Sequence, residues 1–462
     1  MKAQEYLDCL TEQIRYQPAR YAVREEVRAH IEDQRLAYEA RGLGPEEAEV
    51  LAVRQMGDPV EAGVELDRVH RPRMAWGMFV LAGVLCAVWM VLPRLLSVGN
   101  VYENVQELLP RGLFAVFCMG IMLVVCYLDY SRIGRYAGRI ALVAGGLCLV
   151  GMVSSGVSPG ISGDINGTGL WVFVMSMARI DFRLCLLLYV PLYAAILYSY
   201  RNGGRKDVGT CLLWLLPPLG MAFCMADVAT AFLLLFCCGT LFVVVVCKKW
   251  YHVSTKFALC GFGAMMTSVV LAFAAYIFFA APKYQVDRAW NLLGRGEPSY
   301  MFRMVSEVLA GSRWLGRANG RAAGEILSRE GHGLCMGDFM LTELGGHYGM
   351  VFAAVLAAAI VFLLSYLLRA CLRQKNQLGM LMGLGCALVL LQQTGCYILL
   401  NAGIVNLGGG FFCPFVTYGR GGMLLTSVLL GILLSVYRHQ NVLPKDTAVE
   451  RLGRIRVTVL PE

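Results

Sequence analysis

The chain has 462 residues, of which 57% are hydrophobic and 16% are charged, and its mean hydropathy is +0.58. This composition excludes an ordinary soluble globular protein and indicates that most of the chain lies in a membrane. The formal net charge is +9, yet residues 1–73 contain 11 Lys and Arg against 15 Asp and Glu. The basic excess therefore belongs to the apolar part, where membrane orientation explains it better than a nucleic-acid partner does.

Residues 1–72 are polar and are predicted to form a small cytoplasmic helical domain. One helix is indicated by apolar residues near helical spacing, which are Val23, Val27, Ile31 and Leu36. Residues 44–47 (Gly-Pro-Glu-Glu) begin another helix, with proline first and acids in its first turn. Residues 58–61 (Asp-Pro-Val-Glu) repeat this pattern as a capping box, with Asp58 as the cap.

The rest of the chain is organised as membrane spans. A bilayer-spanning helix needs about 20 mostly apolar residues. Ten segments meet this requirement, at about 74–96, 112–130, 139–157, 184–201, 208–225, 228–247, 258–280, 346–369, 378–400 and 421–437. The sequence therefore predicts an all-α polytopic membrane protein, with a membrane domain at 73–440 and a large loop at 281–345.

Basic residues indicate the orientation of these spans, because they favour the cytoplasmic side. They occur in every second loop, at Arg132, Arg135, Arg139, Arg201, Arg205, Lys206, Lys248, Lys249, Arg369, Arg373 and Lys375. An even number of spans with both termini in the cytoplasm accounts for this pattern. The loop at 281–345 is then extracellular, and residues 441–462 form a cytoplasmic tail.

Two aspartates stand at the mouths of predicted spans. Asp338 ends the hydrophilic segment shortly before the eighth span, and Asp227 begins the sixth. A carboxylate at the end of a membrane helix is costly to bury, which favours a functional role. Helix capping is the alternative for both residues, and the local sequence leaves it open.

Six fragments carry a resemblance to a known family. They are residues 165–171 (Ile-Asn-Gly-Thr-Gly-Leu-Trp), 226–231 (Ala-Asp-Val-Ala-Thr-Ala), 284–288 (Tyr-Gln-Val-Asp-Arg), 338–349 from Asp-Phe to Gly, 401–403 (Asn-Ala-Gly) and 414–419 (Pro-Phe-Val-Thr-Tyr-Gly). In this order and spacing, residues 74–437 resemble the SEDS family, the FtsW/RodA/SpoVE group of bacterial shape, elongation, division and sporulation proteins. Residues 1–72 resemble a permease-prefix (HAAS-type) domain, through residues 24–26, 30–33 and 56–59.

The chain departs from the family pattern in four places, one of which is a shorter loop between Asn401 and Pro414. Residues 178–183 (Ala-Arg-Ile-Asp-Phe-Arg) replace Pro-Ser-Glu-x-x-Lys, so Arg183 can replace the lysine but the glutamate position is apolar. Residues 419–422 (Gly-Arg-Gly-Gly) replace the usual continuation after Tyr-Gly and introduce Arg420. An acidic pair becomes Gly346-His347. These changes concern substrate contacts more than the fold.

The resemblance implies a glycosyltransferase of the bacterial cytoplasmic membrane that polymerises lipid II, an undecaprenyl-linked disaccharide-pentapeptide. Asp338 then takes the role of general base that activates a sugar hydroxyl. The resemblance also implies a class B penicillin-binding protein as partner. A divalent cation, Mg²⁺ or Mn²⁺, can bridge Asp338 and the pyrophosphate, and no organic cofactor is expected.

Further candidate substrate residues follow from the motifs. Arginine suits phosphate oxygens, which selects Arg288, Arg183 and Arg420. The motif positions add Asp227, Asn401 and Tyr418, although Asn401 and Tyr418 can instead fix loop geometry. Two other functions remain open: a flippase or transporter for a lipid-linked sugar, and a non-catalytic cell-wall scaffold. The choice among division, elongation and sporulation is not determined by the sequence.

Overall fold

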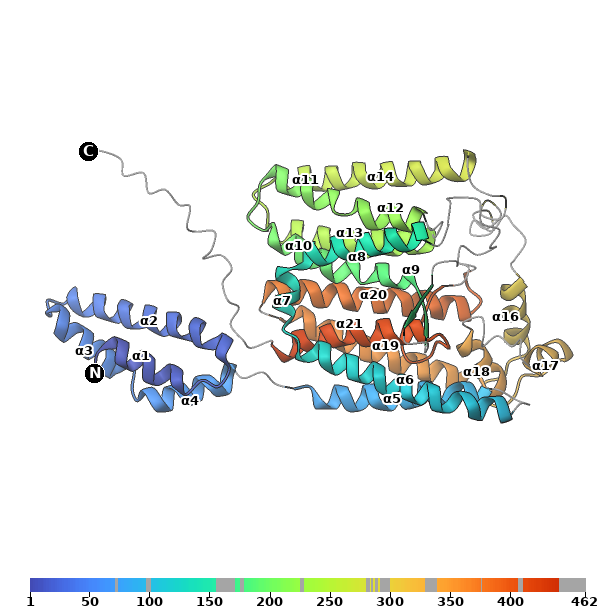
Figure 1. Cartoon of the computed structure of the whole chain (residues 1–462), viewed down its shortest axis with the longest axis horizontal. Coiled ribbons are helices and arrows are strands. Elements are labelled where there is room, and N and C mark those ends of the chain that lie inside the picture. Colours follow the sequence, from blue (N-terminus) through green and yellow to red (C-terminus); the bar gives the residue numbers. More distant parts are fainter. Residues whose placement is uncertain are drawn as a thin grey trace. The chain divides into compact units, whose positions relative to one another are not determined.

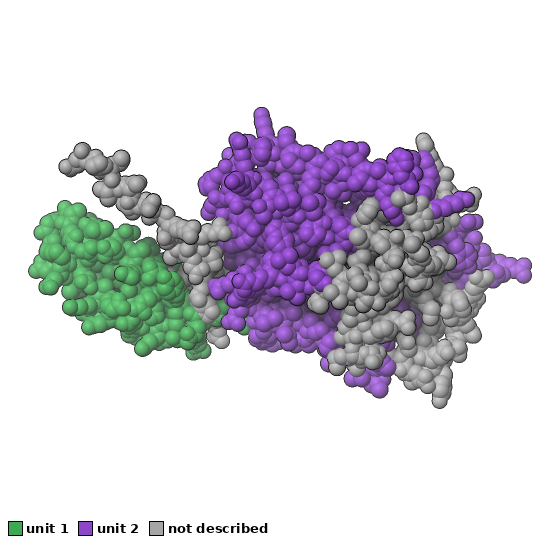
Figure 2. Space-filling view, turned by 45° about the horizontal axis from the view of Figure 1, so that its top comes forward, with its two compact units in different colours: residues 1–74, 437–462 green, residues 75–436 purple. Residues whose placement is uncertain are grey.

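The computed structural model describes residues 1–70, 74–96, 101–154, 171–174, 178–224, 228–279, 283, 286, 290, 300–328, 339–374, 376–405 and 410–439. The chain divides into two compact units (Figure 2). One contains Met1–Met74 and Tyr437–Glu462, and the other contains Ala75–Val436.

Residues 1–70 of the smaller unit form four helices, α1 (Ala3–Glu12), α2 (Gln17–Glu39), α3 (Pro45–Gln55) and α4 (Pro59–His70). The expected starts at the two prolines are confirmed, and Asp58 Oδ1 accepts a hydrogen bond from Val60 N at 3.1 Å. Its core includes three residues of the predicted apolar stripe, Val23, Val27 and Ile31. Leu36 is 50% exposed, because five residues beyond Ile31 correspond to a rotation of about 140° around the helix.

Seven helices in the described part of the larger unit are long and apolar enough to cross a membrane. They are α5 (Trp76–Leu96), α6 (Val101–Tyr127), α13 (Val228–Cys247), α14 (Thr255–Phe279), α19 (Met350–Leu372), α20 (Gln377–Asn401) and α21 (Arg420–Arg438). These helices run side by side in a bundle (Figure 1). Helix α20 packs against α13 and α19, and most of its side chains are buried.

The other three predicted spans correspond to shorter or broken helices. The third lies on α8 (Ala137–Ser154), which follows the short α7 (Tyr130–Arg135). The fourth is divided into α9 (Phe182–Leu187) and α10 (Tyr189–Ser199), and the fifth into α11 (Arg205–Leu213) and α12 (Leu216–Cys224). The helix before each break ends four residues before a proline, at Leu187 before Pro191 and at Leu213 before Pro217. A proline ring clashes with the carbonyl four residues earlier, and proline lacks the N–H that would bond it. The count of ten spans remains a prediction.

One short hairpin departs from the all-α prediction. Strands β1 (Trp171–Val174) and β2 (Ala178–Asp181) pair antiparallel, with Trp171 opposite Asp181. The segment Trp-Val-Phe-Val is rich in aromatic and β-branched residues, which pack well in an extended pair. The hairpin therefore ends just before the predicted fourth span at 184–201, and a helix begins at Phe182, two residues before the predicted start.

The two ends of the bundle differ. Helices α16 (Tyr300–Gly311), α17 (Arg321–Ser328) and α18 (Met340–Tyr348) gather at one end, called the α18 end (Figure 1). The basic loops lie at the opposite end, where Asn202 N donates to Trp250 O at 2.7 Å and Arg201 bonds Gln377. This separation agrees with the expectation that the α18 end is extracellular.

Candidate functional site

Helix α20 holds the beginning of α18. Met340 N donates to the hydroxyl of Tyr397 at 3.2 Å, and Thr342 N donates to Asn401 Oδ1 at 3.1 Å. The Thr342 hydroxyl also donates to Asn401 O at 2.8 Å. The first four N–H groups of a helix have no partner inside the helix, so side chains of α20 satisfy two of them. The start of α18 is thereby fixed to a helix whose side chains are mostly buried.

This anchor follows the predicted base in the chain. Phe339 is 4% exposed and occupies the N-cap position of α18. Asp338 precedes it in the chain and lies outside the described residues, as do Arg288 and Asp227. Asn401 therefore contacts the first turn of α18, which follows Asp338 in the chain. Its side chain accepts from Thr342 N and donates to Tyr397 O.

The loop at 410–419, which carries the Pro-Phe-Val-Thr-Tyr-Gly motif, forms a second fixed element. Phe412 N donates to Gln393 Oε1 of α20 at 3.2 Å. Cys413 N donates to the Thr417 hydroxyl at 2.6 Å, which closes the loop on itself. Phe415 has a φ of 62°, a left-handed conformation that is uncommon for a bulky residue. A strained residue of this kind persists only where its surroundings hold it.

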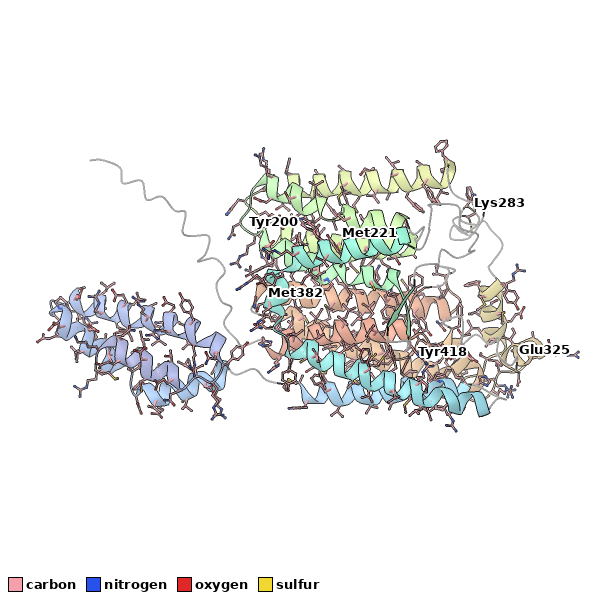
Figure 3. The ribbon with its side chains drawn as sticks, viewed as in Figure 1. Tyr200, Met221, Lys283, Glu325, Met382 and Tyr418 are labelled. Carbon is pink, nitrogen blue, oxygen red and sulfur yellow. The ribbon has the colours of Figure 1, made fainter. Side chains whose placement is uncertain are left out.

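A buried arginine holds the end of this loop. Arg111 of α6 is 4% exposed, and its Nη2 donates to Tyr418 O at 2.9 Å. Its guanidinium carbon lies 4.3 Å from the ring centroid of Trp89 and 4.4 Å from that of Tyr418. Trp89 Nε1 donates to Thr417 O at 2.8 Å. Figure 3 shows Tyr418 toward the α18 end of the bundle, where Glu325 of α17 also lies.

The sequence interpretation missed Arg111 and Trp89. Arg111 directly precedes the second predicted span and resembles an ordinary flanking charge, while Trp89 resembles an apolar residue of the first span. A signal was available, since ionisable residues that enter a membrane helix are rare and usually functional.

Arg420 and Arg183 are the two candidates that remain among the described residues. Arg420 is the first residue of α21 and is half-buried, directly after the loop. Arg183 lies in α9, beyond the hairpin, and its side chain is outside the described part. The structure thus joins Tyr418 and Arg420 in one segment and Asn401 to α18. It does not show Arg183 meeting either group.

Helix α18 also carries two titratable residues that were not selected as sites. Glu343 is 5% exposed, one turn after Phe339. His347 replaces part of the family's acidic pair, and burial lowers its pKa below the ordinary value of 6.5, with a smaller effect from the charge of Arg317. Within the described ranges, no three His, Cys, Asp or Glu side chains gather closely enough to hold a metal ion. The divalent cation therefore stays a prediction.

An apolar groove opens between α12, α13 and α14. Its cavity volume is about 220 Å³, and its walls include Leu219 of α12, Phe232 of α13 and Phe273 of α14. Phe232 is near the beginning of α13, and Phe273 is 18 residues after the start of α14. At 1.5 Å per residue, Phe273 is about 27 Å along that helix, so the groove lies in the half of the bundle nearer the α18 end.

Comparisons with known proteins agree with this architecture. The family model described as "Cell cycle protein" (FtsW/RodA/SpoVE) matches residues 72–442. A probable peptidoglycan glycosyltransferase FtsW of Geobacter sulfurreducens is 24% identical over 402 residues, covering 81% of this chain and 97% of that protein. The protein of the same description from Geobacter metallireducens is 23% identical over 367 residues, covering 72% of this chain and 85% of its own length.

Two solved structures share the fold. A chain from a peptidoglycan synthase complex, studied for the coordination of polymerization and crosslinking, aligns with a TM-score of 0.59 and 17% identity, covering 79% of this chain and 98% of its own. The rod shape determining protein RodA of Thermus thermophilus aligns with a TM-score of 0.50 and 16% identity, covering 79% of this chain and 97% of its own. Because the family match extends over most of the membrane unit, the chain belongs to the FtsW/RodA/SpoVE cell cycle protein family.

Proposed function

We propose that this protein is a membrane peptidoglycan glycosyltransferase that polymerises lipid II into glycan strands for division, shape or sporulation. The observation that carries the proposal is the match to relatives of this description along nearly their whole length. The fixed start of α18 supports it, because it provides a rigid support directly after Asp338 in the chain.

Asp338 is proposed as the general base. An acceptor sugar hydroxyl needs a base to become a competent nucleophile, and such catalysis is typically worth about 10²–10⁴ in rate. Catalytic groups need a support whose own position is fixed by packing and hydrogen bonds. Phe339, which is buried, follows Asp338 directly in the chain, and two backbone N–H groups of α18 bond side chains of α20. Together they supply such a support.

The leaving lipid pyrophosphate needs positive charge. Arg420 is proposed as one cation, because it begins α21, where the helix N-terminus also favours anions. Arg288 and Arg183 are proposed from their motif positions. Asp227 is proposed to face the substrate, whereas Asn401 and Tyr418 contribute by fixing α18 and the loop at 410–419. A Mg²⁺ or Mn²⁺ ion held by Asp338 is a further proposal, which chelation tests.

The apolar groove between α12, α13 and α14 is proposed to receive part of the polyprenyl tail. It is lined by aliphatic and aromatic side chains in the half of the bundle nearer the α18 end. Each buried methylene contributes about 0.8 kcal/mol, so even a short length of tail provides useful binding energy. The sugar and pyrophosphate then lie at the bundle end that carries α18.

Membrane topology and partners complete the proposal. The bundle has ten spans, the α18 end is extracellular and both termini are cytoplasmic, as the basic loops indicate. A class B penicillin-binding protein is the proposed partner, supported by likeness to a chain from a peptidoglycan synthase complex. The four-helix unit at the N-terminus is proposed to be a permease-prefix (HAAS-type) docking or regulatory domain.

Purified protein in proteoliposomes tests the activity. It is incubated with lipid II and Mg²⁺ or Mn²⁺, alone and with candidate class B penicillin-binding proteins, and a parallel sample contains EDTA. Glycan ladders are expected, and their loss with EDTA would support the cation. Well-folded protein that makes no ladder under any condition, or that only moves lipid II across the bilayer, would contradict the assignment.

A further inference from the structure

Helix α6 does not need a buried arginine in order to span the membrane, so the burial of Arg111 has another cause. A guanidinium at 4% exposure has lost its water, and such a charge is costly unless other groups compensate. The compensation comes from parts of the chain far away in sequence: the hydrogen bond to Tyr418 O joins residues 307 positions apart.

The geometry points to Arg111 as a positioning residue for the loop at 410–419. Its guanidinium is enclosed by the rings of Trp89 and Tyr418, at 4.3 and 4.4 Å from their centroids. Trp89 bonds the carbonyl of Thr417, and Arg111 bonds the next carbonyl, that of Tyr418. Two successive peptide groups of the loop are thus held by α5 and α6.

These bonds act at the junction of the loop with α21. Gly419 and Arg420 follow Tyr418 directly, and Arg420 is the first residue of α21. On the α20 side, the loop is held by the bond from Phe412 N to Gln393. Arg111 therefore completes a frame that presents Arg420 at the end of the bundle. The guanidinium itself is covered by two rings, so it acts through Tyr418 and not on the substrate.

Hydrogen exchange measures this role directly, and the variants are chosen to separate charge from shape. Arg111→Gln removes the cation, and Arg111→Lys retains it with one donor group. Trp89→Phe keeps an aromatic ring but removes the hydrogen bond to Thr417 O. This variant replaces Arg111→Gln in the experiment if Arg111→Gln does not fold. Arg139→Gln is the matched control, because Arg139 also lies over an aromatic ring, that of Tyr136, but is exposed near the other end of the bundle.

Deuterium uptake is followed by mass spectrometry in peptides that cover residues 410–419. Exchange at the amides of Phe412 and Cys413 is expected to be about tenfold faster or more in Arg111→Gln. A desolvated cation–aromatic contact exceeds the free energy that corresponds to a tenfold change. Arg111→Lys should recover part of the protection, and Arg139→Gln should behave as the wild type.

The inference rests on the proposed function only for its effect on glycan synthesis. Arg111→Gln should lower kcat with the loss of loop protection, and Arg111→Lys should restore part of both. Unchanged exchange in Arg111→Gln would overturn the inference, even if activity were lost, since the arginine would then act on substrate. If the wild type makes no glycan, the proposed function fails, while the exchange data still decide whether Arg111 positions the loop.

Discussion

Replacing Asn401 with alanine should uncouple α18 from α20. In the wild type, the Asn401 side chain accepts from Thr342 N at 3.1 Å and donates to Tyr397 O at 3.0 Å. Alanine leaves the amide of Thr342 buried without this acceptor, because Thr342 is 1% exposed. The bond from the Thr342 hydroxyl to the backbone carbonyl of residue 401 survives the substitution.

The magnitude follows from the orphaned amide. A buried donor that loses its acceptor costs about 1–3 kcal/mol, and loss of a helix cap costs about 0.5–2 kcal/mol. We therefore expect a decrease of about 1–3 kcal/mol in the stability of the α18–α20 junction. A displacement of about 1 Å at a catalytic group can lower the rate by about 10²-fold. The loss of activity should thus be larger than the loss of global stability suggests.

The assay compares this variant with Asn376→Ala. Asn376 caps the other end of α20 and accepts from Leu378 N at 3.0 Å, so each variant removes a side-chain acceptor for a backbone amide in the first turn of a helix, α18 for Asn401 and α20 for Asn376. Thermal unfolding in detergent should show small decreases for both proteins. Initial rates of glycan synthesis should decrease about 10–100-fold in Asn401→Ala only. Equal rates in the two variants would refute the idea that the α18 anchor supports catalysis.

Three further changes test separate parts of the account. Gly349→Ala should lower the melting temperature much more than Gly120→Ala, since Gly349 has a φ of 114° and an added Cβ would lie 2.5 Å from Trp314 O, while Gly120 has open space; equal effects would contradict this. Burial lowers the pKa of His347, so its stabilising contribution is complete above about pH 6.5 and is lost as the pH falls toward the lowered value. The melting temperature should therefore decrease more on acidification in the wild type than in His347→Gln, and parallel curves would disprove it. Ala231→Trp should fill the apolar groove and raise KM about tenfold or more for long-tailed lipid II, while a short-tailed analogue reacts as before; no change for either substrate would remove the tail from the groove.

Patterns that are local in sequence predicted much of the fold. The seven long spans follow from apolar length alone, because a bilayer demands about 20 such residues. The helix starts at Pro45 and Pro59 follow from proline and acids in the first turn. The breaks before Pro191 and Pro217 were also open to prediction from the proline rule, but the apolar runs around them suggested continuous spans.

Contacts between distant segments could not be predicted in the same way. The enclosure of Arg111 depends on Tyr418, and the anchor of Thr342 depends on Asn401, 59 positions later. A single sequence shows the motif that contains Asn401, but not the atoms that it bonds. The hairpin at Trp171 was missed because the apolar segment that follows suggested only a helix. The candidate base itself, Asp338, remains a prediction.

The most direct test of the proposed function is the rate of lipid II polymerisation by Asp338→Asn. Asp129→Asn is the matched control, since Asp129 caps α7 at the other end of the bundle and accepts from Ser131 N at 2.9 Å. We predict that wild type and Asp129→Asn make glycan ladders, and that Asp338→Asn is slower by about 10²–10⁴ with unchanged folding. Polymerisation by Asp338→Asn at the wild-type rate would contradict the assignment of the base.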